Sequence, residues 1–262
     1  MRYSITTIGA CIGLSSSAVL AQNPGQNVTV NVVVDTVITI GDTTSVSYHV
    51  ANLASSTEPL WVYYVDTPSG VRSMAPSTGS FRWRTGTNFN GRPMAGWMFL
   101  YGYLQPGETT PTLSFKSVGL AAIRTFWAGG YVPLPSAVDT DVTESTVLAD
   151  PFVTEMINGQ TVGVEPWPAD RSGQALLLRL RSLTENNCSG PLNWITDSSL
   201  CGQLLNDLNQ AEIYRANGEP EPARAAIVDY EGRLAGGKAV GTVSSPSYWL
   251  LRSNAGIVRS TL

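Results

Sequence analysis

The sequence has little of what catalytic and metal sites are usually built from. Its 262 residues include one histidine, His49, and three cysteines. It contains no Gly-x-Ser-x-Gly elbow, His-Glu-x-x-His helix, phosphate loop or dinucleotide fingerprint. Two cysteines and a distant histidine do not supply the four ligands of a zinc site. We therefore expect no catalytic residues, no metal and no cofactor, and an enzymatic role is the less favoured interpretation.

Positive charge and long apolar runs are also scarce. The sequence has 16 basic and 20 acidic residues, which gives a formal net charge of −4. This balance argues against nucleic acid and anionic membranes as partners. After residue 21 no apolar stretch approaches the roughly 20 residues of a membrane-spanning helix. We expect no transmembrane helix once the N-terminal segment is removed.

Residues 1–21 have the pattern of a cleavable secretory signal. Arg2 precedes an apolar stretch, and small residues end it at Val19-Leu20-Ala21. A rival interpretation makes Cys11 a lipidated N-terminus. Cleavage after Ala21 would remove Arg2 and leave a net charge of −5. The sequence thus predicts an exported bacterial protein that is periplasmic, on the cell surface or extracellular.

The two cysteines that follow the signal are close in sequence. In an exported protein, Cys188 and Cys201 are expected to form a disulfide that clips the loop before a helix to the first turn of that helix. The alternative is a pair of free buried thiols.

Residues 22–135 show the two-residue alternation of β-strands. Val46, Tyr48 and Val50 alternate with Ser45, Ser47 and His49, which predicts a half-buried strand. Further strands are expected near residues 28–32, 60–65, 80–84, 96–103, 110–117 and 123–128, with turn clusters between them. The turn Leu104–Glu108 resembles one common in bacterial immunoglobulin-like accessory domains. We predict an all-β antiparallel immunoglobulin-like sandwich.

Aromatic residues are dense in this β-rich part and allow two interpretations. In the first they fill the core, with Trp61 and Tyr63 on one face of a strand and Trp97, Phe99, Tyr101 and Tyr103 on one face of another. In the second, some rings are exposed and stack on sugars. The binding residues predicted for that case are Arg82, Trp83, Arg84 and, in the following loop, Arg92.

His49 shares a strand face with Ser45 and Ser47. An acyl-transfer site would also need an orienting acid and an oxyanion hole, and the sequence shows neither. We expect a solvent-facing histidine.

Residues 136–170 are expected to be a linker with possible short strands at 147–152 and 161–164. Asp139, Asp141, Glu144 and Asp150 could hold a calcium ion, although the ligand order of a known calcium loop is missing. Two prolines that flank Trp167 predict a stiff boundary.

Residues 171–262 switch to helical spacing and predict a four-helix bundle. Asp197 is the expected N-cap of the second helix, Pro220 and Pro222 fit the opening turn of the third, and Gly236-Gly237 is expected to end it. The fourth helix is expected to begin at Ser245-Pro246, with Ser245 as its N-cap and Pro246 in its first position. Its apolar segment Ser247–Leu251 could also form a docking face, with Trp249 left outside the helix core.

Part of this bundle resembles the FIMAH-type helical module of secreted bacterial proteins. The resemblance covers residues 196–262, together with the preceding Ile195. It implies an extracytoplasmic accessory module without catalytic residues. The residues that carry it are Ile195-Thr196-Asp197, Leu204-Leu205, Leu208, Gln210-Ala211, Asn217-Gly218, Ala223-Arg224, Leu234 and Ala255.

Together these patterns predict a two-domain protein, the sandwich followed by the disulfide-clipped helical bundle. Its expected function is binding or surface-accessory work, with a polysaccharide or another envelope or surface protein as partner. One alternative is a secreted hydrolase at the domain junction that uses Asp139, Asp141, Glu144 or Glu165. Another is a structural envelope component that associates with itself.

Overall fold

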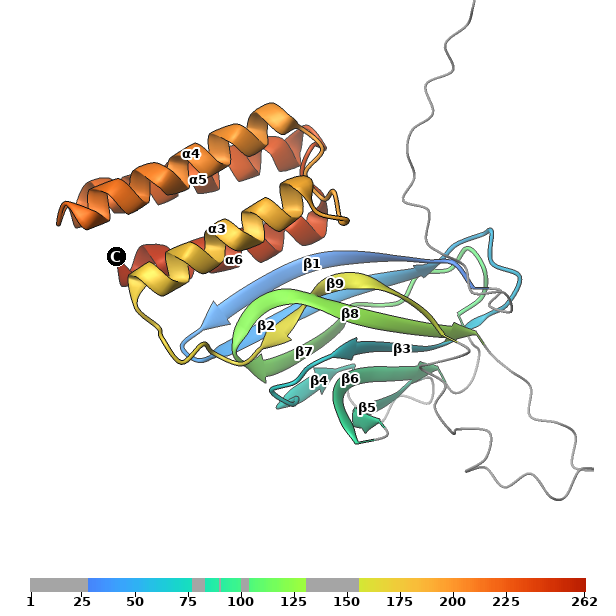
Figure 1. Ribbon diagram of the computed structural model, residues 1–262. Coiled ribbons are helices and arrows are strands. Elements are labelled where there is room, and N and C mark those ends of the chain that lie inside the picture. Colours follow the sequence, from blue (N-terminus) through green and yellow to red (C-terminus); the bar gives the residue numbers. More distant parts are fainter. Residues whose placement is uncertain (1–27, 77–82, 90, 100–103, 131–155) are drawn as a thin grey trace, which may run out of the picture.

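The computed structural model describes residues 28–76, 83–89, 91–99, 104–130 and 156–262 (Figure 1). Within these ranges the chain forms two antiparallel sheets and four helices. The predicted signal at 1–21, the strand expected at 147–152 and the acidic residues between 139 and 150 lie outside the described residues.

The two sheets contain nine strands in the described part of the chain. The four-stranded sheet has the order β1 (Val30–Ile40), β2 (Thr43–Asn52), β7 (Leu113–Val118), β4 (Ser73–Ala75). The five-stranded sheet has the order β5 (Trp83–Phe89), β6 (Arg92–Phe99), β3 (Leu60–Asp66), β8 (Leu120–Gly130), β9 (Ile157–Glu165). All neighbouring strands are antiparallel, as predicted. Strand β9 contains the short strand expected at 161–164.

The space between the sheets is filled by aromatic rings. Tyr48, Tyr63, Trp97, Phe115 and Phe126 have centroids 5.7 to 6.5 Å apart, and Trp97 is fully buried. This confirms the interpretation of these rings as core residues, since large rings bury the most apolar area.

Trp61 and Tyr63 do not share a face, so that prediction is wrong. The pairing of β3 with β8 shifts in register between Leu60 and Val62. A bulge of this kind places an extra residue in one strand and changes the side on which the preceding side chains lie. Tyr63 therefore joins the core, whereas Trp61 packs with Val62 and Tyr64 on the outer face of the five-stranded sheet.

The four helices follow the sheets in the chain and lie close to the expected positions. They are α3 (Gly173–Ser189), α4 (Ser198–Ala216), α5 (Pro220–Ala239) and α6 (Ser245–Thr261). Asp197 caps α4, because its Oδ1 accepts hydrogen bonds from the amides of Ser199 and Leu200 at 2.9 and 3.1 Å. No helix in the described ranges combines the length and apolar character needed to cross a membrane.

Two helix ends differ from the prediction. Gly236-Gly237 does not end α5, which continues to Ala239. A Cβ on Gly237 would lie 2.5 Å from Leu200 Cδ2, so this glycine allows close packing of α5 on α4. The N-cap of α6 is Ser244 rather than Ser245, with the Ser244 hydroxyl accepting a hydrogen bond from the amide of Ser247.

Cys188 at the end of α3 is disulfide-bonded to Cys201 in the first turn of α4. The prediction of this pair is confirmed. The bridge joins the first two helices across the connection between them.

Replacing both cysteines with alanine is expected to lower the free energy of unfolding by about 3 kcal/mol, because the bridge restricts the unfolded chain over a separation of 13 residues. Urea unfolding of the two proteins measures the difference. A thiol titration of the denatured chain from Gln22 onward should find no free thiol. Two reactive thiols, or equal stability, would contradict this prediction.

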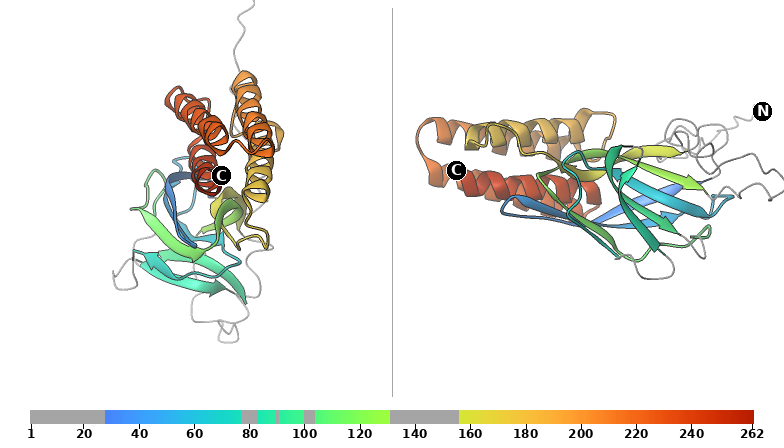
Figure 2. Two further views of the ribbon diagram at one scale, coloured as in Figure 1. Left: turned by 90° about the vertical axis from the view of Figure 1, so that its left-hand side faces the viewer. Right: turned by 90° about the horizontal axis from the view of Figure 1, so that it is seen from below.

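Helices α3 and α6 lie against the sheets. Helices α4 and α5 lie on the side of α3 and α6 that faces away from the sheets (Figure 1). Helix α6 runs along β1, the edge strand of the four-stranded sheet. The Thr39 and Ser253 hydroxyls are 3.0 Å apart, and Asn254 Nδ2 donates to the Ala121 carbonyl at 3.1 Å. The helices extend past one end of the sheets (Figure 2).

One continuous cluster of buried apolar residues joins the sheets to the helices, from Tyr48 and Trp97 to Leu180 and Leu251. The two-domain arrangement is therefore not confirmed. The helices also cover an edge strand that would otherwise present unpaired backbone groups.

Candidate functional site

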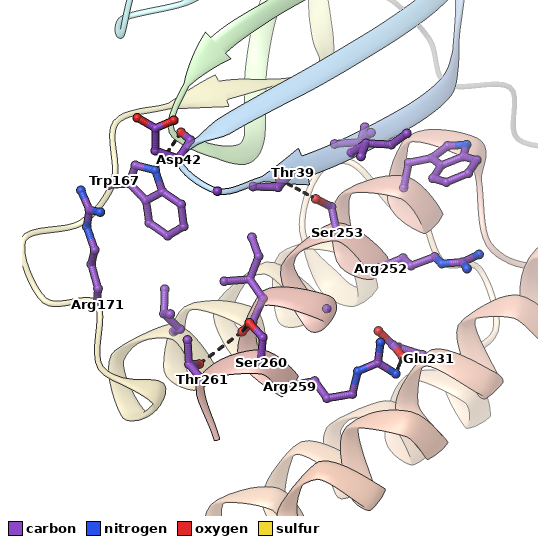
Figure 3. Close-up of a pocket in the computed structure, with 17 residues that line it drawn as sticks. Thr39, Asp42, Trp167, Arg171, Glu231, Arg252, Ser253, Arg259, Ser260 and Thr261 are labelled. Atoms are coloured by element: carbon purple, nitrogen blue, oxygen red, sulfur yellow. Dashed lines mark hydrogen bonds and ion pairs between the residues drawn. The ribbon is translucent and has the colours of Figure 1, made fainter.

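A groove of about 980 Å³ opens where the helices meet the sheets (Figure 3). It lies between the end of β1, the connection from β9 to α3, and helices α5 and α6. Ligand sites often form at such junctions of structural units. The polar, charged and aromatic residues that line it are Thr39, Asp42, Trp167, Arg171, Glu231, Trp249, Arg252, Ser253, Arg259, Ser260 and Thr261.

One side of the groove is formed by Trp167 and Arg171. The indole Nε1 of Trp167 donates to the Asp42 carbonyl at 3.0 Å, which holds the ring against the β1–β2 turn. The guanidinium carbon of Arg171 lies 4.7 Å from the centroid of this ring. Stacking of this kind orients the guanidinium without neutralising its charge.

The other side is formed by residues of α6. The half-buried ring of Trp249 packs edge-on against Tyr248 at 5.1 Å. Arg252 lies over both rings, 6.0 Å from Trp249 and 5.5 Å from Tyr248, and donates to the Tyr248 hydroxyl. Each indole of the groove is thus in contact with an arginine guanidinium.

The carboxylates of the groove already have partners. Glu231 forms an ion pair with Arg259 at 2.8 Å, and Asp42 lies 3.6 Å from Arg72, which is outside the groove. Partial burial raises the pKa of Glu231, and Arg259 and Arg252 oppose this shift. Neither Arg171 nor Arg252 forms an ion pair with a carboxylate of the described residues. Two guanidinium groups therefore remain available to an anion.

The predicted binding residues lie far from this groove. Trp83 and Arg84 begin β5, at the edge of the five-stranded sheet opposite β9, and pair with Phe99 and Met98. Arg92 is exposed at the start of β6, and Arg82 lies outside the described residues. Trp83 and Arg84 therefore lie at one end of the β5–β6 hairpin and Arg92 lies at the other, so the structure does not bring the predicted residues together.

A smaller hollow of about 260 Å³ lies between these two ends of the hairpin, on the outer face of the five-stranded sheet. It is lined by Tyr64, Thr85, Gly86, Asn88, Phe89, Gly96 and Met98. A Cβ on Gly96 would lie 2.4 Å from the Tyr64 ring, so the ring rests directly on this glycine. Burial raises the pKa of Tyr64 to about 12.

His49 has an acidic partner that we did not predict. Asp35 Oδ2 lies 2.6 Å from His49 Nδ1, and His49 Nε2 lies 3.3 Å from the Thr112 hydroxyl. The register of β1 against β2 shifts between Val34 and Thr36 and leaves Asp35 as the extra residue. The sequence did not reveal this acid, and His49 itself is partly exposed, with 39% of its side chain accessible. None of these three residues lines either hollow, and the contact of Asp35 with His49 joins β1 to β2.

Glu165, one of the acids of the hydrolase alternative, forms an ion pair with Arg179. Arg179 also donates to the Ala121 carbonyl at 2.8 Å, so this pair ties α3 to the sheet. Asp139, Asp141 and Glu144 lie outside the described residues. No group of three or more His, Cys, Asp or Glu side chains in the described ranges is placed to hold a metal ion.

Sequence analysis missed Arg171, Glu231, Arg252 and Arg259. A weak signal was present, because Arg171 follows Trp167 by four residues and Arg252 follows Trp249 by three. A three-residue step places two side chains on one helix face. The two tryptophan–arginine pairs line one groove only because α6 packs on β1.

No family model and no curated protein matches this sequence. Among solved structures, a similar chain belongs to a protein from Nocardia farcinica whose crystal structure is described as having an immunoglobulin-like fold. The two chains are 18% identical, and the match covers 45% of this chain and 91% of that one with a TM-score of 0.29. A likeness this weak carries no argument about this chain.

Proposed function

We propose that this chain is an exported, non-catalytic binding protein that holds a polysaccharide in the groove between sheets and helices. The observation that carries the proposal is the pair of half-buried indoles, Trp167 and Trp249, that line one groove of about 980 Å³. Flat rings with polar edges can stack on sugar rings. The Thr39 and Ser253 hydroxyls, which are 3.0 Å apart, also line the groove, and each can form a further hydrogen bond.

Export is supported by the pattern of residues 1–21 and by the Cys188–Cys201 bridge, since disulfides persist in oxidising compartments. We further propose that the sandwich is immunoglobulin-like and that the helices act as a FIMAH-type accessory module.

The outer face of the five-stranded sheet is a second candidate surface for the same ligand class. It is favoured by the hollow beside Phe89 and by its closeness to three of the predicted residues, Trp83, Arg84 and Arg92. The two surfaces lie on different parts of the molecule, so single substitutions separate them.

Affinity electrophoresis of the exported chain through gels that contain individual neutral and acidic polysaccharides tests the proposal. Replacing Trp249 with alanine is expected to weaken retardation about tenfold, because the loss of one stacked ring corresponds to about 1.4 kcal/mol. Phe89→Ala, in the smaller hollow, is the matched control and should bind as the parent does.

Loss of binding in Phe89→Ala with normal binding in Trp249→Ala would move the site to the outer sheet face. No retardation in any gel would contradict the proposal. Release of new reducing ends from a retarding polymer would favour the hydrolase alternative, and concentration-dependent self-association without sugar binding would favour the structural one.

A further inference from the structure

Arg171 and Arg252 line the groove and form no ion pair with its carboxylates, although Arg252 interacts electrostatically with Glu231. The groove lining contains three arginines and two acids, and both acids are already paired. In a chain with fewer basic than acidic residues, two arginines without a carboxylate partner on opposite sides of one groove are a local exception. In Figure 3, Arg171 lies beside Trp167, with Arg252 across the groove from it.

We propose that the ligand of this groove is an acidic polysaccharide, whose carboxylates pair with Arg171 and Arg252 while its sugar rings stack on Trp167 and Trp249. This inference rests on the proposed function and adds the chemical class of the ligand and the residues that select it.

The geometry suits a carboxylate in particular. A guanidinium presents a planar fork of donors that matches the two oxygens of a carboxylate. The guanidinium carbon of Arg171 lies 4.7 Å from the Trp167 ring centroid and that of Arg252 lies 5.5 Å from the Tyr248 centroid, and these contacts restrict both side chains before an anion binds. An arginine beside each indole can pair with a charge carried on the same sugar that stacks on the ring.

The arrangement favours a sugar polymer over other anions. Nucleic acid binding draws most of its affinity from a broad basic surface, whereas this chain has a net charge of −4. An acidic peptide offers carboxylates on flexible side chains but no flat ring for Trp167 and Trp249. A uronic acid polymer offers both groups in a fixed relation.

Glu231 lowers the positive charge that the groove offers a ligand, because its carboxylate forms an ion pair with Arg259. Glu231→Gln removes the competing carboxylate and leaves Arg259 available to the ligand. This variant is expected to bind an acidic polymer several-fold more tightly than the parent, whereas a merely structural ion pair would leave the affinity unchanged or lower.

The test compares polygalacturonate with its methyl-esterified form, which keeps the rings and removes the charge. Calorimetric titration of the exported chain should show binding to the acid form and about tenfold weaker binding to the ester. Arg171→Gln and Arg252→Gln should each weaken binding of the acid form about tenfold and leave ester binding unchanged. Retained ester binding also shows that these variants are folded.

Arg224→Gln is the control, because Arg224 pairs with Glu221 on α5 and does not line the groove. Equal affinity for acid and ester, with both weakened by Trp249→Ala, would leave the proposed function standing and overturn this inference. Parent-like binding by Arg171→Gln and Arg252→Gln would overturn it as well. So would equal affinity for polyglutamate, which has the charge without the rings. If the chain does not bind polygalacturonate but binds a neutral polymer through Trp249, this inference is overturned and the proposed function stands.

Discussion

Replacing Trp97 with alanine is expected to lower the free energy of unfolding by about 3 to 5 kcal/mol. The ring is fully buried between the two sheets and packs against Tyr48, Tyr63 and Phe115. Its Nε1 donates to the Ala75 carbonyl at 3.1 Å, and this hydrogen bond would be lost as well. Alanine would leave a cavity that the surrounding rings cannot fill without shifting.

Because the apolar core continues into the helices, the destabilisation should extend beyond the sheets. Helical circular dichroism of Trp97→Ala is expected to disappear at a lower urea concentration than that of the parent. Trp61→Ala, on the outer sheet face, is the control, and we expect a loss of about 1 kcal/mol. Helices that keep the parent's midpoint in Trp97→Ala would contradict the shared core.

Replacing Asn254 with aspartate is expected to cost about 3 to 5 kcal/mol at neutral pH. Asn254 is buried where α6 meets the sheets, and its Nδ2 donates to the carbonyls of Ala121 at 3.1 Å and Leu250 at 2.8 Å. Aspartate has nearly the same shape but would point a carboxylate oxygen at two carbonyl oxygens. The change therefore tests the junction without creating a cavity.

The stability of this variant should also depend on pH. Burial and the two carbonyls would raise the pKa of the new carboxyl in the folded state. Arg179, which donates to the same Ala121 carbonyl, would oppose this shift only in part, because it is already paired with Glu165. The folded state would therefore bind the proton more tightly than the unfolded chain does. Stability would then be lost as the pH rises through the interval between the unfolded and folded pKa values, and recovered as the pH falls. Thermal unfolding of the variant and the parent at several pH values measures how the stability of each depends on pH.

Asn209→Asp makes the same chemical change on the exposed face of α4 and should alter stability by no more than about 0.5 kcal/mol. If Asn254→Asp is equally mild at neutral pH, the side chain is not buried at the junction as the structure has it.

Local signals in the sequence were sufficient for most elements. The alternation of Val46, Tyr48 and Val50 identifies β2, and Asp197 caps α4, because both depend on neighbouring residues only. Gly236-Gly237 misled the prediction, since the packing of Gly237 against Leu200 outweighs the low helix propensity of glycine.

Features that depend on register or on distant packing could not be predicted. The faces of Trp61 and Tyr63 depend on a bulge that appears only when β3 pairs with β8. The contact of Asp35 with His49 requires the register of β1 against β2. The two prolines that flank Trp167 were interpreted as a stiff boundary, and Trp249 was interpreted as left outside the helix core. Only the docking of α6 on β1 brings both rings to one groove.

Hydrogen exchange at increasing urea concentration tests most directly whether the sheets and helices form the single folded unit that creates the groove. Amides of β2 and α6 are expected to exchange through one global opening, with the same free energy and the same dependence on urea. Protection that persists in β2 at urea concentrations where α6 exchanges freely would contradict this account.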